Sequence, residues 1–170
     1  MKPTHTAVSI SLVIILAAIL CILFFFPKIS DFSFFSDKDP FKNVTYTIDG
    51  NPVKVRYFGN EVKLDFDKDG REDIAFIATH SPGGSGTFYY VVMALNTVEG
   101  YKSGEGFFLG DRIAPQSTEL TRGNAIIVNY ADRKDGEGFS AQPSLGKSKL
   151  LLFDLKTMKF DEVVYMGSTK

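Results

Sequence analysis

The acidic residues at positions 65 to 73 form the segment whose residue types and spacing best fit a definite chemistry. The segment has the sequence D-F-D-K-D-G-R-E-D, in which five acids and two bases leave a local charge of −3. Carboxylates this close together repel one another unless a cation joins them, and Ca²⁺ takes about six to eight oxygen ligands. Gly70 allows the positive-φ turn that wraps a chain around an ion. We therefore predict a calcium site formed by the side chains of Asp65, Asp67, Asp69 and Asp73 and the main-chain carbonyl of Arg71.

The spacing D-x-D-x-D-G-x-x-D resembles the calcium-binding hairpins of integrin-type repeats, which lie between two strands. A helix-loop-helix calcium site does not fit, because its twelfth loop position requires an acid and Phe76 stands there. The alternative is an acidic hairpin that binds no metal.

Other polar residues give weaker indications of chemistry. His80 is accompanied only by His5, which precedes a long apolar segment, so we expect His80 to be a solvated loop residue. The glycine-rich residues 81–86 lack the Lys-Ser/Thr ending of a phosphate-binding loop and precede a strand, which favours a turn. The pairs Asp111-Arg112 and Asp132-Arg133 predict local ion pairs or carbonyl caps, with the alternative that both arginines join Tyr130 in binding an anion. We assign no catalytic residue and expect a protein that is not an enzyme.

The positioning elements are predicted to be strands throughout the folded part. Residues 74–79 and 87–95 are apolar along their whole length, which is typical of strands buried on both faces. Residues 49–52, with the sequence D-G-N-P, and residues 59–60, with the sequence G-N, predict turns. Residues 131–148 predict a long loop. The pattern predicts an all-β fold, an antiparallel sandwich or barrel of about nine short strands, at 44–48, 53–58, 61–66, 74–79, 87–95, 117–121, 125–130, 149–154 and 159–165.

Residues 7–26 (Ala7 to Phe26) are uncharged and long enough to cross a bilayer. These 20 residues would span roughly 30 Å as a helix. The run continues to Pro27 without a small-x-small cleavage site, and the bulky Leu20 before Cys21 does not fit a lipoprotein signal. We therefore predict an uncleaved, single-pass transmembrane helix as the membrane partner of this chain. The expected domains are an N-terminal tail at 1–6, the anchor at 7–26, a juxtamembrane linker at 27–42 and a β-rich domain at 43–170.

The net charge and the cysteine content limit which partners and which cellular compartment are expected for this protein. The part from residue 43 onward has 15 Lys+Arg and 17 Asp+Glu, a net charge of −2, which excludes the basic footprint of a nucleic-acid partner. The single cysteine excludes an intrachain disulfide and a cysteine-based zinc site. Lysines at 2, 28 and 38 slightly disfavour an exported C-terminus. A weak calcium site nevertheless suits the outside of a cell, where such modules work at about 10⁻⁴–10⁻³ M calcium, so we expect an extracytoplasmic domain on the cell membrane.

Four further sequence blocks form a recognisable set. Together with the acidic hairpin, they resemble an uncharacterised bacterial family of membrane-anchored or exported domains over about residues 44–154. The blocks are GGSGTFYYVVMALNT (83–97), GDRIAPQST (110–118), IIVNYADRK (126–134) and QPSLGKSK (142–149). The short link at 51–57 and Gly138-Phe139 depart from the pattern of that family. The resemblance implies a location and a fold, but no activity or catalytic residue.

These observations favour a membrane-anchored, extracytoplasmic β-domain, stabilised by calcium, that binds an envelope protein or ligand. Two alternatives stay open. One is a metal-assisted hydrolase that uses the aspartates or His80. The other is a structural subunit of an envelope assembly, held by the helix and the phenylalanine-rich linker.

Overall fold

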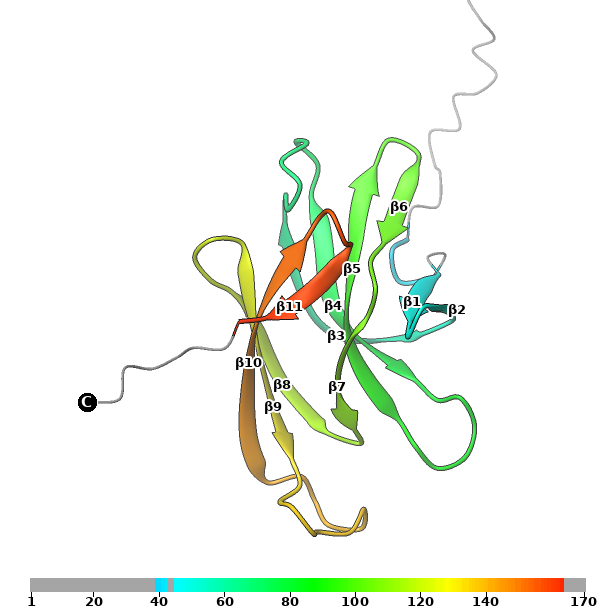
Figure 1. The fold of residues 1–170 in the computed structure, drawn as a ribbon, viewed down its shortest axis with the longest axis vertical. Helices are drawn as coiled ribbons and strands as arrows, with labels where there is room; N and C mark the ends of the chain where they lie inside the picture. Colours follow the sequence, from blue (N-terminus) through cyan, green and yellow to red (C-terminus); the bar gives the residue numbers. More distant parts are fainter. Residues whose placement is uncertain (1–38, 43–44, 164–170) are drawn as a thin grey trace, which may run out of the picture. The chain divides into compact units, whose positions relative to one another are not determined.

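The computed structural model describes residues 39–42 and 45–163, and antiparallel strands form its framework (Figure 1). Within these residues there are eleven strands and no helix, which confirms the all-β prediction. The strands are β1 (Tyr46–Ile48), β2 (Asn51–Val53), β3 (Arg56–Leu64), β4 (Asp73–His80), β5 (Phe88–Thr97), β6 (Gly100–Ser103), β7 (Phe107–Asp111), β8 (Ala114–Leu120), β9 (Ala125–Asp132), β10 (Leu145–Asp154) and β11 (Lys159–Glu162).

The strands form three antiparallel sheets. One has the order β3-β4-β5-β6, with β7 also paired to β5, and a second has the order β11-β10-β9-β8. β1 and β2 form a two-stranded sheet of their own. β6 pairs with the C-terminal half of β5 and β7 with its N-terminal half, so these two short strands follow one another along the same edge.

The two larger sheets pack on each other through a shared apolar core. Because side chains alternate along a strand, Ala75 and Ile77 of β4 face this core, where they meet Ile126 and Val128 of β9 and Leu151 of β10. The opposite face of β4 also carries buried apolar residues, Ile74, Phe76 and Ala78, which pack against Tyr46 and Ile48 of β1. This accounts for the uninterrupted apolar run in β4, which lies in the middle of a sandwich-like arrangement extended by the β1–β2 hairpin.

Several predicted boundaries differ from the structure. The predicted strands at 53–58 and 61–66 belong largely to one strand, β3, because Gly59 and Asn60 produce bulges instead of a turn. The predicted turn at 49–52 is shorter, since Asn51 and Pro52 already pair with β1. β6 and β7 were not predicted from the sequence. The predicted loop at 131–148 is also shorter, because β10 begins at Leu145.

In the part of the chain that the structure covers, no helix has the length and apolar character needed to cross a membrane. The predicted tail at 1–6, the anchor at 7–26 and most of the linker at 27–42 lie outside the described residues.

Candidate metal centre

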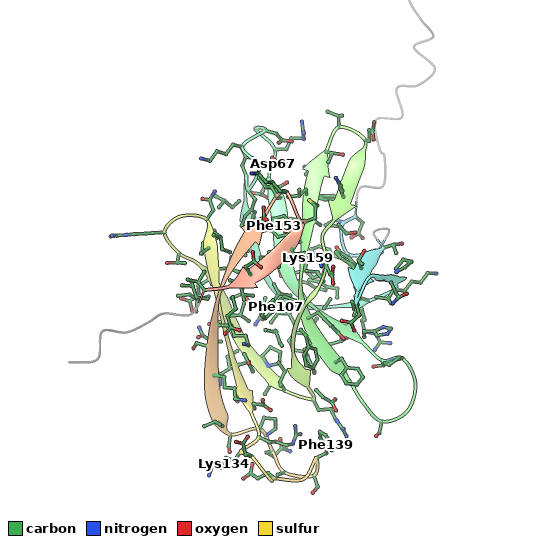
Figure 2. All side chains as sticks on the ribbon, in the orientation of Figure 1. Asp67, Phe107, Lys134, Phe139, Phe153 and Lys159 are labelled. Carbon is green, nitrogen blue, oxygen red and sulfur yellow. The ribbon has the colours of Figure 1, made fainter. Side chains whose placement is uncertain are left out.

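The acidic segment forms the loop between β3, which ends at Leu64, and β4, which begins at Asp73. Figure 2 shows Asp67 on this loop. Lys68 and Gly70 have φ angles of 63° and 87°. For Lys68 this conformation is uncommon, whereas a glycine adopts it without steric cost. The loop therefore turns tightly at Gly70, as the sequence predicts, and also at Lys68, for which no such turn was predicted.

Main-chain amides inside the loop hold two of the aspartates in place. The backbone N–H of Asp69 donates to Oδ1 of Asp65 at 3.0 Å and to Oδ1 of Asp67 at 3.2 Å. The N–H of Gly70 donates to the other oxygen of Asp65 at 2.9 Å. Carboxylate oxygens have about two acceptor sites each, so these bonds orient the side chains and leave acceptor capacity for a cation.

Three of the predicted ligands come together. Carboxylate oxygens of Asp65, Asp67 and Asp73 all lie within 4.8 Å of one another. Asp65 and Asp67 are partly exposed, while Asp73 is fully buried. An oxygen-only donor set of this kind matches a hard cation such as Ca²⁺ and not a metal that prefers sulfur or nitrogen ligands. The residues present therefore fit the predicted ion.

Asp73 is the structural centre of the group. Its Oδ2 accepts the backbone N–H of Phe66 at 2.8 Å, and its Oδ1 accepts that of Asn96 at 2.7 Å. Burial raises the pKa of the Asp73 carboxyl above its ordinary value, against the opposing effect of these hydrogen bonds. Proximity to Asp67 raises the pKa further. Burial and the neighbouring acid therefore both disfavour the ionised form of Asp73, and a bound cation would stabilise that form.

Asp69 and Arg71 have a different arrangement from the one predicted for a ligand pair. Asp69 accepts the backbone N–H of Arg71 at 2.9 Å and forms an ion pair with its guanidinium group. The Nε of Arg71 also donates to the carbonyl of Asn96. Asp69 therefore lies outside the three-carboxylate group, and its partner Arg71 connects the loop to the end of β5. The predicted contribution of Arg71 is its main-chain carbonyl, so this use of its side chain does not compete with it.

The other candidate residues lie elsewhere in the domain. Arg112 pairs with Asp111 at 2.8 Å, as predicted. Asp132 pairs with Lys147 at 2.8 Å, and Arg133 instead donates to main-chain carbonyls, the other predicted role. Arg112 and Arg133 both approach the ring of Phe139, at 3.5 Å and 5.6 Å from its centroid. Their guanidinium groups therefore contact the β9–β10 loop at Phe139, which is labelled in Figure 2. Neither forms a hydrogen bond or a cation–π contact with Tyr130.

His80 lies at the end of β4 and contributes to two adjoining grooves. One has a volume of about 510 Å³ and an aromatic lining. The other, of about 410 Å³, is lined by polar residues that include Lys54 and Arg56. Sequence reasoning missed this region, because the β2–β3 link and the end of β4 are neighbours only in the folded chain. Asn96, whose backbone holds both Asp73 and Arg71, was missed for the same reason.

Comparison with known proteins identifies no relative of this chain. No family model, no curated protein and no solved structure matches it.

Proposed function

We propose that this protein is a membrane-anchored, extracytoplasmic β-domain that binds calcium in the β3–β4 loop and serves as a binding module of the cell envelope. The observation that carries the calcium assignment is the grouping of Asp65, Asp67 and Asp73, whose carboxylate oxygens lie within 4.8 Å of one another. The chain joins these acids to a buried position at the start of β4, so binding of a cation is coupled to the stability of the sheet.

Calcium at this site would stabilise the domain by a modest but useful amount. With a dissociation constant of about 0.1 mM and about 1 mM calcium, binding adds roughly 1.4 kcal/mol to the free energy of unfolding. The total free energy of unfolding of a domain is only about 5–15 kcal/mol. A site of this affinity would be occupied outside the cell and empty at cytosolic calcium levels, which is consistent with the proposed location. The support for that location from this chain is the uncharged segment at residues 7–26.

A binding role is better supported than a hydrolase. The acidic loop lies at one end of β4 and His80 at the other, seven residue steps from Asp73. At about 3.3 Å per residue, this separation is roughly 23 Å. A metal in the loop and the grooves near His80 therefore belong to different regions, whereas metal-assisted hydrolysis requires the ion and the substrate at the same place.

Thermal unfolding of the full chain in calcium, in magnesium and in chelator tests the metal assignment. We expect the unfolding temperature to rise by several degrees in calcium and by much less in magnesium. Asp67→Asn should abolish the calcium-dependent rise. Asp135→Asn is the matched control, because Asp135 is an exposed acid of the β9–β10 loop. The metal assignment fails if calcium gives no rise, or if Asp67→Asn retains it in full.

The location is tested separately. Cells that express the full chain with a protease-sensitive tag after residue 170 would be treated with external protease. Loss of the tag from intact cells supports an outer domain, and its protection until the cells are lysed would contradict the proposed orientation.

A further inference from the structure

The two grooves that meet at His80 form a second site, which differs from the metal loop in both place and chemistry. The first groove lies between the β1–β2 hairpin and the end of the β4–β5 hairpin, which Figure 1 shows on the same side of the larger sheet. Its apolar lining consists of Ile48, Val53, Pro82, Phe88, Tyr90 and Phe108. Asp49 and Asn51 of the β1–β2 hairpin, together with His80, are its polar lining residues. Phe108 is half exposed and lies against Tyr90, with ring centroids 5.4 Å apart.

The second groove adjoins the first and has a different character. His80 lines both grooves. In addition, Val53 and Phe88 of the first groove are followed or preceded in the chain by Lys54 and Thr87 of the second, so the two grooves are adjacent. The polar groove is lined by Lys54 and Arg56 together with His80, Val55 and three hydroxyl residues, Thr79, Ser81 and Thr87. Hydroxyl and guanidinium donors in this combination are suited to an oxyanion.

The two positive charges of the polar groove have no acidic partner among the described residues. Lys54 and Arg56 are exposed, and neither side chain forms an ion pair or hydrogen bond within residues 39–42 and 45–163. Asp49 is the acid that lines the adjoining aromatic groove, and it forms no ion pair with either cation. Glu61 accepts a hydrogen bond from Tyr57, and Asp111 pairs with Arg112. The domain as a whole is slightly acidic, and these two cations without an ion pair lie together beside an aromatic groove.

We propose that these adjoining grooves bind an amphipathic organic anion, in which a carboxylate or phosphate lies at Lys54 and Arg56 and an attached aromatic or alkyl body lies in the groove formed by Phe88, Tyr90 and Phe108. The combined grooves have the size of small-molecule sites, which are about 300–1,000 Å³. The positive charges of Lys54 and Arg56 favour an anionic group on the ligand, and the apolar lining favours an attached aromatic or alkyl group. The inference concerns a different site from the calcium loop and holds whether or not that loop binds metal.

Four small probes separate the contributions of charge and body. The full chain is reconstituted in lipid nanodiscs, and empty nanodiscs provide the blank for isothermal titration. The probes are 3-phenylpropionate, phenyl phosphate, the neutral 3-phenylpropionamide and propionate, which lacks the ring. We expect both ring-bearing anions to bind at least about tenfold more tightly than the amide, since hydrogen bonds to charged groups are the stronger ones. Propionate should also bind more weakly than 3-phenylpropionate, because it buries less apolar surface.

Matched variants place the binding on the proposed residues. Arg56→Gln and Lys54→Gln remove exposed charges without opening a core, and each should weaken 3-phenylpropionate about tenfold with little effect on the amide. Arg122→Gln is the control, because Arg122 is exposed on the β8–β9 turn. Phe108→Ala should weaken the ring-bearing anions and leave propionate unchanged.

The outcomes decide the proposal. A preference of tenfold or more for phenyl phosphate over 3-phenylpropionate would assign the anion as a phosphate, and the reverse would assign a carboxylate; both support the site. Equal binding of 3-phenylpropionate and its amide would indicate a neutral apolar occupant and overturn the anion assignment. Unchanged affinity in both Arg56→Gln and Lys54→Gln, or no binding of either ring-bearing anion, would overturn the site itself. Titrations in calcium and in chelator keep this result separate from failure of the metal assignment.

Discussion

The carboxylate of Asp73 accepts a hydrogen bond from the backbone N–H of Asn96, with Oδ1 and N 2.7 Å apart, so a buried side chain at the start of β4 holds the end of the neighbouring strand β5. Its second oxygen accepts the N–H of Phe66 in the acidic loop at 2.8 Å. The Asp73 side chain therefore joins the acidic loop to the sheet, and it does so whether or not a cation is bound.

Asp73→Asn should destabilise the domain even without metal. An amide offers one oxygen where the carboxylate offers two, so one buried N–H donor loses its acceptor and faces the NH₂ group. We expect a loss of about 2–4 kcal/mol in the free energy of unfolding. Urea unfolding in chelator measures it, with Asp135→Asn as the exposed control. Equal stability of Asp73→Asn and the unmodified protein in chelator would contradict the structural role.

The Asp111 carboxyl should make the free energy of unfolding depend on pH in the acid range. The hydrogen bond from the Arg112 guanidinium group holds the pKa of the Asp111 carboxyl below its ordinary value of 3.8, and the backbone N–H of Thr87 acts in the same direction. A carboxyl whose folded pKa is depressed stabilises the fold above its unfolded pKa, and this contribution is lost as the pH falls through the folded pKa.

Urea unfolding at a series of pH values tests this expectation with Asp111→Asn. At neutral pH the variant should be less stable by about 1 kcal/mol, and the difference should shrink as the pH falls below about 4. A difference that is constant over the whole acid range would show that Asp111 contributes through hydrogen bonding alone.

Arg133 should order the β9–β10 loop. Its Nη1 donates to the carbonyl of Arg112 and its Nε to that of Ala141, both at 2.8 Å, and Nη2 approaches the carbonyl of Phe139 at 3.4 Å. Lysine cannot reproduce this fork. We therefore expect Arg133→Lys to increase amide hydrogen exchange in residues 134–143 at least about tenfold while β4 and β5 keep their protection. Exchange in the loop that matches the unmodified protein would contradict this role; Lys134→Ala is the control.

Gly104 should tolerate no side chain. A Cβ at this position would lie 2.7 Å from the carbonyl oxygen of Met158 and 2.9 Å from the ring of Phe153, so the link between β6 and β7 fits closely under the β10–β11 hairpin. Gly104→Ala should cost about 1–3 kcal/mol in the free energy of unfolding. Gly146→Ala is the matched control, because its Cβ would meet no atom within 4 Å. Similar unfolding free energies for both variants would argue against close packing at Gly104.

The strands that were predicted well from the sequence are those with an uninterrupted run of apolar residues. The apolar runs at 74–79 and 87–95 lie in β4 and β5 because both strands are buried on two faces. β7 was missed because glycines at 104, 106 and 110 surround and interrupt it. Gly59 and Asn60 have the composition of a turn, but their positive φ angles serve bulges within β3. Local composition does not distinguish these two uses.

The candidate metal site was predictable in part for a related reason. The alternation of Asp65 and Asp67 and the return of the chain at Asp73 bring three acids together, as the spacing suggested. Spacing does not determine where a side chain finds its partner, and Asp69 turns to Arg71 instead. The grooves near His80 depend on contacts between β1–β2, β4 and β7, which no local motif encodes.

The separate β1–β2 hairpin has a mechanical consequence. It is the first paired element after residue 38, and its Tyr46 hydroxyl donates to the carbonyl of Pro40 at 2.8 Å. A force that enters the domain from its N-terminal side therefore loads this hairpin before it reaches the two larger sheets. The hairpin is held to the larger sheet by the packing of Tyr46 and Ile48 on β4, and to the link after β6 by main-chain contacts such as the N–H of Gly106 donating to the carbonyl of Thr47 at 2.8 Å. Displacing the hairpin under tension would expose the apolar cluster that Tyr46 and Ile48 form with β4, and it would remove one wall of the aromatic groove.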